Sequence, residues 1–148
     1  MGRFIFSLQN ILNIKEKLEE QAKNEYSQAN LLLQEAIAKR ELLEARLAEE
    51  NSRLQADISD SLNVREIRER EEAVEIFRMY VRQQILVVMQ REKEVEVARE
   101  HLNEAMKERK TFEKLREHAF EKFRLEENLR EQKEVDELVS YRYGLDSD

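Results

Sequence analysis

The stretch Ser59-Asp60-Ser61-Leu62-Asn63 decides the fold, because it is the only interior place where helix-disfavouring residues gather. Serine, aspartate and asparagine side chains compete for backbone hydrogen bonds, so they favour caps and turns over helix interiors. Asn63 can cap a following helix, and Glu66 stands three residues later, as in a capping box. We therefore predict a bend at 59–63 between two long helices, which short connections usually make antiparallel. The alternative is one uninterrupted helix through this stretch.

The composition favours long helices on both sides of this bend. The 148 residues include no proline, and the two glycines stand at positions 2 and 144. Charged residues make up 40% and apolar residues 41% of the chain, which is typical of long helices and coiled coils. We predict an all-α fold, an antiparallel two-helix coiled-coil hairpin with a longer second helix. A single domain would span 1–148, with helix 1 at about 7–58, the turn at 59–63 and helix 2 at about 64–143.

Several classes of function are disfavoured by charge and composition. A formal net charge of −7 argues against nucleic-acid binding, which needs a basic surface. The absence of cysteine excludes disulfides and thiolate metal sites, and it fits a reducing compartment. No apolar run approaches the roughly 20 residues that a membrane span needs, and 1–12 lacks the features of a signal peptide. We expect a soluble cytoplasmic protein without direct membrane insertion.

Apolar residues recur at heptad spacing on both predicted helices. Ser7 is the candidate N-cap of the first helix, and Gly144 is the candidate end of the second. Arg40 and Glu50 stand on the first stripe as imperfect seam positions. The rest of this pattern is Leu8, Ile11, Leu12, Leu18, Ala22, Ala29, Leu33, Ala36, Leu43, Leu47 and Leu54. The second helix carries one row with Val74, Val81, Val88, Val95, Leu102, Arg109, Arg116 and Phe123. Its companion row is Phe77, Ala98, Ala105, Phe112 and Ala119, with Ile85 and Met106 one residue to the side.

The two predicted helices differ in length, so the end of the second should lack a partner from its own chain. Counted outward from the turn, Leu12 reaches about Lys110, and pairing ends at about Glu117. A lone helix in water gains nothing by displaying apolar side chains, so an outside partner or self-association is implied. A misplaced turn or a tilted first helix is the alternative. The apolar residues of this overhang are Phe120, Phe123, Leu125, Leu129 and Val135.

The segment 77–89 is too apolar for a single seam. Its residues 85–89 are five consecutive apolar residues, which cover more than a full turn of an α-helix. One interpretation is a second, exposed face that docks another protein. The other is a thicker local core against Leu31, Leu32 and Leu33, and both can hold in part.

Residues for catalysis are not apparent in the sequence. His101 and His118 are isolated, and neither has a second histidine at helical spacing. The chain has no glycine-rich loop that could hold a phosphate and no nucleophile beside a base. We therefore predict no enzymatic activity, no cofactor and no metal site.

Two parts of the sequence resemble the FliJ family, the small coiled-coil component of the bacterial flagellar type III export apparatus. The aromatic-rich opening Phe4-Ile5-Phe6-Ser7-Leu8-Gln9-Asn10-Ile11-Leu12, followed by Lys15-Glu16, is similar to the N-terminal pattern of that family. The C-terminal pattern is carried by Leu115-Arg116-Glu117, Glu126-Glu127, Glu131-Gln132-Lys133 and Asp136-Glu137. The size, the bend and the longer second helix also fit.

The resemblance implies a stalk similar to the axle-like part of the γ subunit of F-type ATPases. The implied partner is the hexameric export ATPase FliI, with both ends of the hairpin entering its ring. The residues of this chain that match the C-terminal pattern are Gln132, Lys133, Asp136 and Glu137. Phe120 and Phe123 share that segment, without matching a family motif.

A second implied partner is the export gate protein FlhA, which the family contacts through the middle of its second helix. The corresponding residues are Tyr80, Val81, Gln84 and Val88, although Gln84 stands where an apolar residue is expected. Escort of export chaperones, and a peripheral place at the inner-membrane base of the flagellum, are also implied.

Two other functions fit the same sequence pattern. One is the equivalent stalk of a virulence type III secretion system, which genomic neighbours would distinguish. The other is a self-associating structural coiled coil without an ATPase partner. A mass measurement in solution separates the latter, because a stable dimer favours the scaffold.

Overall fold

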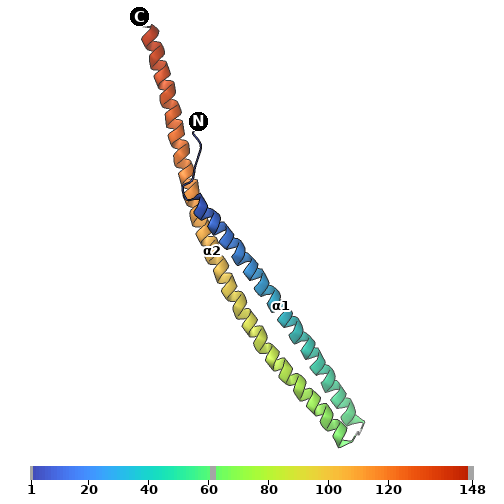
Figure 1. Cartoon of the computed structure of the whole chain (residues 1–148). Helices are drawn as coiled ribbons and strands as arrows, with labels where there is room; N and C mark the ends of the chain where they lie inside the picture. Colours follow the sequence, from blue (N-terminus) through green and yellow to red (C-terminus); the bar gives the residue numbers. More distant parts are fainter. Residues whose placement is uncertain (1, 61–62, 147–148) are drawn as a thin grey trace. The chain divides into compact units, whose positions relative to one another are not determined.

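Two helices account for nearly all of the described chain. The computed structural model describes residues 2–60 and 63–146, with side chains up to residue 145. Helix α1 comprises Gln9–Ser59 and helix α2 comprises Val64–Asp146 (Figure 1). Because α1 and α2 pack against each other and α2 is the longer, the predicted all-α hairpin is confirmed.

The bend falls where the polar stretch predicts it. The N–H of Asp60 donates to the carbonyl of Ala56 at 3.0 Å, which closes the last turn of α1. The side-chain Oδ1 of Asn63 accepts from the N–H of Glu66 at 2.9 Å, and its carbonyl accepts from Ile67 at 3.2 Å. Asn63 is thus the N-cap of α2, as predicted. Ser61 and Leu62 of the predicted turn lie outside the described residues.

The predicted start of α1 and the predicted end of α2 each differ from the structure by two or three residues. Ser7 is not the N-cap, because α1 begins at Gln9 and the carbonyl of Leu8 accepts the first helical bond, from Leu12 at 3.0 Å. Gly144 does not end α2, which continues to Asp146. A glycine permits a helix to end without forcing it, since one glycine costs only about 1 kcal/mol inside a helix.

The chain divides into two units that share both helices. Unit 1 consists of Met1–Gln21 with Asn103–Asp148, and unit 2 consists of Ala22–Leu102. The single coiled-coil domain expected over 1–148 stays a prediction.

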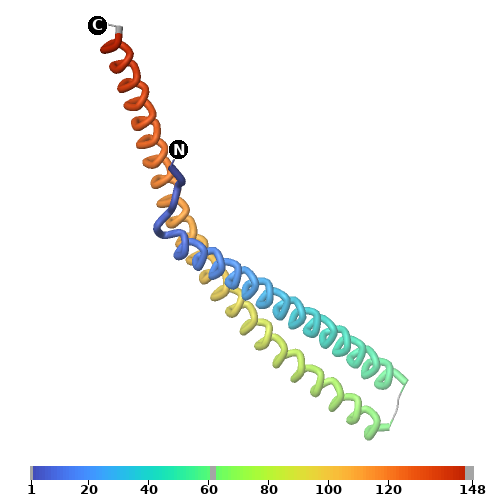
Figure 2. Tube along the Cα trace, turned by 45° about the horizontal axis from the view of Figure 1, so that its top comes forward, coloured from blue at the N-terminus to red at the C-terminus, as the bar shows by residue number. Residues whose placement is uncertain are grey.

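Unit 2 is an antiparallel hairpin with a seam of small residues. In both views, the part of α1 that leads into the turn lies beside the part of α2 that leaves it (Figure 1 and Figure 2). Seven-residue rows on both helices supply the buried side chains, as the heptad pattern predicts. Alanines on one side let the helices approach closely, while valines on the other fill the space between them. The buried apolar residues are Ala22, Ala29 and Ala36 on α1 and Val74, Val81, Val88 and Ala98 on α2.

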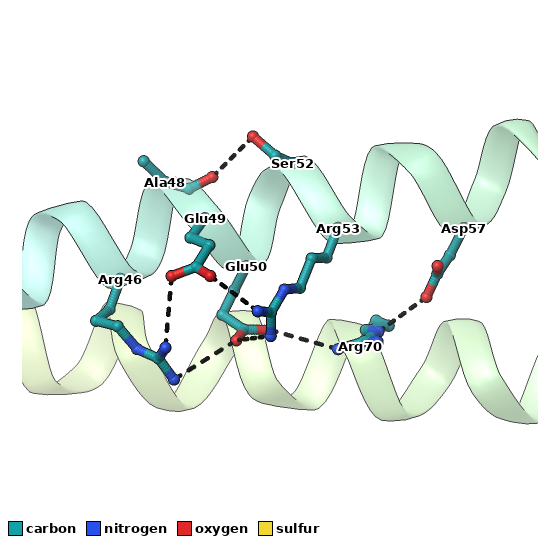
Figure 3. Close-up of polar contacts among 8 residues, drawn as sticks. All are labelled: Arg46, Ala48, Glu49, Glu50, Ser52, Arg53, Asp57 and Arg70. Carbon is teal, nitrogen blue, oxygen red and sulfur yellow. Dashed lines mark hydrogen bonds and ion pairs between the residues drawn. The ribbon is translucent and has the colours of Figure 1, made fainter.

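A charged cluster holds the turn end of unit 2 together (Figure 3). Glu50 of α1 is buried, and its Oε2 lies 3.8 Å from Nη1 of Arg70 on α2. Nε of Arg70 also donates to Oδ2 of Asp57 at 2.9 Å, and Nη1 of Arg53 donates to Oε1 of Glu50 at 3.3 Å. Arg40 is half-buried and lies 3.7 Å from Glu44. Arg40 and Glu50 therefore occupy seam positions, as predicted.

In unit 1 the two helices are paired by polar side chains. Glu19 is buried, and it accepts a hydrogen bond from Nη2 of Arg109 at 3.3 Å. Nε of Arg116 donates to Oε1 of Gln9 at 3.0 Å. Leu12 is buried between the helices. Nζ of Lys15, one turn nearer the bend, lies 2.9 Å from Oε2 of Glu108, which agrees with the prediction that Leu12 reaches about Lys110.

Candidate partner-binding surfaces

The N-terminal segment packs onto the part of α2 that was expected to be bare. Residues 2–6 are not helical, and both views show the N-terminal segment beside α2 (Figure 1 and Figure 2). The ring of Phe4 lies 5.2 Å from the ring of Phe120 and 5.5 Å from that of Phe123, between centroids. The guanidinium of Arg116 lies 5.6 Å from the Phe4 centroid, and Phe6 is buried. This aromatic cluster covers part of the predicted overhang.

Pairing within the chain therefore extends to Glu127, and the prediction that it ends at about Glu117 was wrong. Glu127 is buried, and its Oε2 accepts from the N–H of Gly2 at 3.4 Å. Arg130 forms an ion pair with the same carboxylate. An extended residue advances about twice as far as a helical one, which explains the longer reach of a non-helical segment.

Beyond Glu127 the side chains of α2 are exposed through residue 145. No other described segment lies beside this end of α2 in either view (Figure 1 and Figure 2). The candidate ATPase-binding residues Gln132, Lys133, Asp136 and Glu137 all lie here. The structure thus separates these four residues from Phe120 and Phe123, which contact Phe4.

Three of the four candidate gate residues lie in the seam of unit 2 rather than on its surface. Val81 and Val88 are buried. Gln84 is also buried, and its Nε2 donates to the carbonyl of Ala36 at 2.9 Å. That bond explains how a polar side chain occupies a position where the heptad pattern calls for an apolar one. Only Tyr80 is partly exposed, so it alone of the four can contact a partner while the hairpin stays closed.

The structure shows a second stripe along α2, outside the seam, to which Tyr80 and Val87 of the apolar segment 77–89 belong. Its members are spaced alternately by four and three residues, so they share one face of the helix. Two surface hollows adjoin this stripe, one lined in part by Leu43 and the other in part by Ala29. Continuing the heptad count along a second face would have found it. We call it the flank stripe: Ile76, Tyr80, Gln83, Val87, Gln90, Glu94 and Val97.

Both interpretations of the segment 77–89 therefore hold in part. Val81 and Val88 belong to the core, while Leu86 and Met89 are exposed. Leu31 of the expected local core is itself exposed, and Leu32 and Leu33 are half-buried.

The shifted pKa values of Arg109 and Glu94 indicate that these side chains act in ion pairs. The hydrogen bond to Glu19 raises the pKa of Arg109 above its ordinary value, and a second bond to Glu113 adds to this effect. A hydrogen bond from Arg91 lowers the pKa of Glu94. Both shifts favour the charged forms that these groups already have at neutral pH, so they stabilise ion pairs rather than prepare a proton transfer.

The described part of the chain lacks the features of a metal site and of a membrane span. Within residues 2–60 and 63–146, no three histidine, cysteine, aspartate or glutamate side chains form a group that could hold a metal ion. Over the same residues, neither helix has a stretch long and apolar enough to cross a membrane.

Comparison with known families identifies the relatives of this hairpin. A family model described as "Flagellar FliJ protein" matches residues 4–146. The chain belongs to the FliJ family. The match includes both the N-terminal opening and the C-terminal pattern on which the sequence resemblance rests.

A solved structure shares the fold of this FliJ-family chain. It is a protein from Chlamydia trachomatis described as a YscO homolog, with a TM-score of 0.58. The two chains are 19% identical, and the alignment covers 97% of each. At this identity the likeness concerns the fold alone. No curated protein matches the chain in sequence.

Phe4→Ala is expected to release the N-terminal segment of this FliJ-family chain from α2. The substitution removes two ring contacts, each worth about 0.5–1.5 kcal/mol beyond the buried area. Amide hydrogen exchange should therefore accelerate at Gln9, whose N–H donates to the carbonyl of Phe6 at 3.1 Å, by at least about fivefold. Ile5→Ala is the matched control, because Ile5 is 79% exposed. Equal exchange in the two variants would contradict the packing of Phe4 on α2.

Proposed function

We propose that this FliJ-family chain is a non-enzymatic stalk of the flagellar type III export apparatus, which binds the hexameric ATPase FliI. Unit 1 would enter the ring of the ATPase, and any ATP hydrolysis would belong to that partner. The observation that supports the proposal is the exposed end of α2 beyond Glu127. This end presents Gln132, Lys133, Asp136 and Glu137, which match the C-terminal pattern of the family. The aromatic cluster of Phe4, Phe120 and Phe123 lies next to it.

The test is the ATPase rate of purified FliI with the full chain and with two truncated chains. The full chain is expected to stimulate hydrolysis, and a chain that ends after Leu115 is expected not to. A chain that ends after Arg130 keeps the residues that contact Phe4 and removes only the exposed end. Its failure to stimulate would assign the effect to residues 131–148. If the full chain did not stimulate a competent ATPase, the stalk proposal would be wrong and a scaffold would be favoured.

The proposal includes a second contact, in which the flank stripe of unit 2 meets the export gate protein FlhA. The stripe's exposed apolar residues lie on one face of α2, which suits the docking of a partner helix; they are Ile76, Tyr80, Val87 and Val97. Val87→Glu should weaken binding to purified FlhA by at least about tenfold, since it places a charge in the centre of the stripe. Arg82→Glu is the control, because Arg82 is exposed and lies on another side of α2. Equal binding by both variants would remove this contact from the proposal.

Escort of export chaperones and a peripheral place at the inner-membrane base of the flagellum are further parts of the proposal. Co-purification with export chaperones, and release from washed membranes when FlhA is deleted, would test them. The fold shared with a YscO homolog keeps the virulence-type stalk as a second candidate. The genes that neighbour this one would distinguish the two systems.

A further inference from the structure

Near Phe123 the apolar residues of α2 move from one side of the helix to the other. Up to that residue the seam rows carry half-buried side chains such as Ala119 and Phe123. Continued at the same seven-residue spacing, each row next reaches two charged residues. A helix whose seam becomes charged cannot extend the same apolar packing. These next positions are Glu126, Arg130, Lys133 and Glu137.

A different stripe begins where the seam ends. Its six members are spaced by four and three residues in alternation, so they lie on one face of α2. Residues two apart differ by about 200° around a helix, so Leu125 points almost opposite to Phe123. The N-terminal segment that packs on Phe123 therefore leaves this face open. The terminal stripe is Leu125, Leu129, Gln132, Asp136, Val139 and Tyr143, whose apolar members are 57%, 65%, 47% and 74% exposed in chain order.

The terminal stripe is complementary to itself when it is read in the opposite direction. In an antiparallel pair, Leu125 of one copy meets Tyr143 of the other, and Leu129 meets Val139. Gln132 meets Asp136 in the centre, where the amide can donate a hydrogen bond to the carboxylate. Each contact occurs twice, as two-fold symmetry requires. A parallel pair would instead place Asp136 against Asp136, which like charges disfavour.

We propose that two copies of this chain pair through the terminal stripe, α2 against α2 in antiparallel orientation. The pairing covers four apolar side chains that are otherwise in water and surrounds a satisfied polar layer. It also gives tertiary packing to the end of α2 beside which no other described segment lies, and packing of an apolar face supplies most helix stability in proteins. The interface consists of only three kinds of residue pair, each occurring twice, so we expect the dimer to be weak and reversible.

Self-pairing would compete with ATPase docking, because both use Gln132 and Asp136. This consequence rests on the proposed function, whereas the pairing itself does not. The experiments below use the full chain alone, so their failure is distinct from a failure to stimulate the ATPase.

The first test is the mass of the full chain by sedimentation over a range up to about 100 μM. We expect a concentration-dependent shift from monomer to dimer. The double variant Leu129→Glu with Val139→Glu should weaken association by at least about tenfold, because it places carboxylates in both apolar layers. The control Leu138→Glu with Leu145→Glu changes exposed residues on the opposite face and should leave the dimer unchanged. A monomer throughout this range, or equal loss in both variants, would overturn the proposal.

The second test measures the relative orientation of the two paired α2 helices by disulfide cross-linking. Because the chain has no native cysteine, only the introduced cysteines can form disulfides. Leu129→Cys and Val139→Cys are prepared separately, mixed and oxidised. An antiparallel pair predicts a mixed disulfide between the two variants, because a disulfide forms only when Cα atoms come within about 7 Å. Leu129→Cys mixed with Leu138→Cys should link far less. Efficient linkage of Leu129→Cys to itself would indicate a parallel pair and contradict the inference.

Discussion

Val88→Asp is expected to destabilise the hairpin of unit 2 by about 4 kcal/mol, a large share of the 5–15 kcal/mol that usually stabilises a domain. Val88 is 3% exposed and lies in the centre of the seam row that includes Val74 and Val81. The substitution removes about 1.5–3 kcal/mol of apolar burial and adds the cost of placing a carboxylate away from water. Urea unfolding followed by circular dichroism measures the effect.

Leu86→Asp is the control for this prediction, because it introduces the same side chain two residues away. Leu86 is 65% exposed, so its substitution should change the free energy of unfolding by no more than about 0.5 kcal/mol. If the two variants unfolded at the same urea concentration, Val88 could not lie in the seam. The flank stripe was assigned as exposed because it lies outside the seam that contains Val88, so that assignment would be wrong as well.

Leu102→Pro is expected to break α2 at a cost of about 3 kcal/mol or more. Helix α2 is continuous through this position, so proline removes the hydrogen bond from residue 102 to the carbonyl of Ala98 and clashes with that carbonyl. The expected result is lower helix content by circular dichroism and a lower midpoint of thermal unfolding. Under the proposed function, flagellar export should fail as well, since a stalk needs an unbroken helix.

Val64→Pro separates the effect of a broken helix from the effect of adding proline. Val64 is the first residue of α2 and directly follows the N-cap Asn63, a position at which proline is well tolerated. This variant should keep the stability and export activity of the unchanged chain. Export that survived Leu102→Pro would make a rigid-stalk mechanism untenable.

The local features of this fold could be predicted from the sequence because each depends on residues a few positions apart. The bend follows from Asn63, whose side chain caps the helix that starts one residue later. The seam rows follow from heptad spacing, which also identified Arg40 and Glu50 as seam positions. The sequence did not place the two outer helix ends, since Ser7 and Gly144 permit an end without requiring one.

The candidate surfaces depended on contacts that local periodicity does not contain. Burial of Val81 and Val88 was implied by their row, yet the resemblance assigned them to an outside partner. Gln84 could be placed only when the carbonyl of Ala36, on the other helix, was seen to accept its amide. The spacing of the flank stripe is present in the sequence, but its exposure became evident only when the structure showed which face of α2 the first helix covers.

The sequence by itself determined two long helices, their bend and their seam, because capping and heptad spacing act within a turn or two of helix. Only the tertiary structure decided how far along α2 the N-terminal segment of the same chain packs. Phe4 meets Phe120 and Phe123 from a segment more than a hundred residues away, and Gly2 reaches Glu127. A non-helical segment has no repeat that predicts its path, so its position follows from the aromatic and polar contacts that it makes on α2.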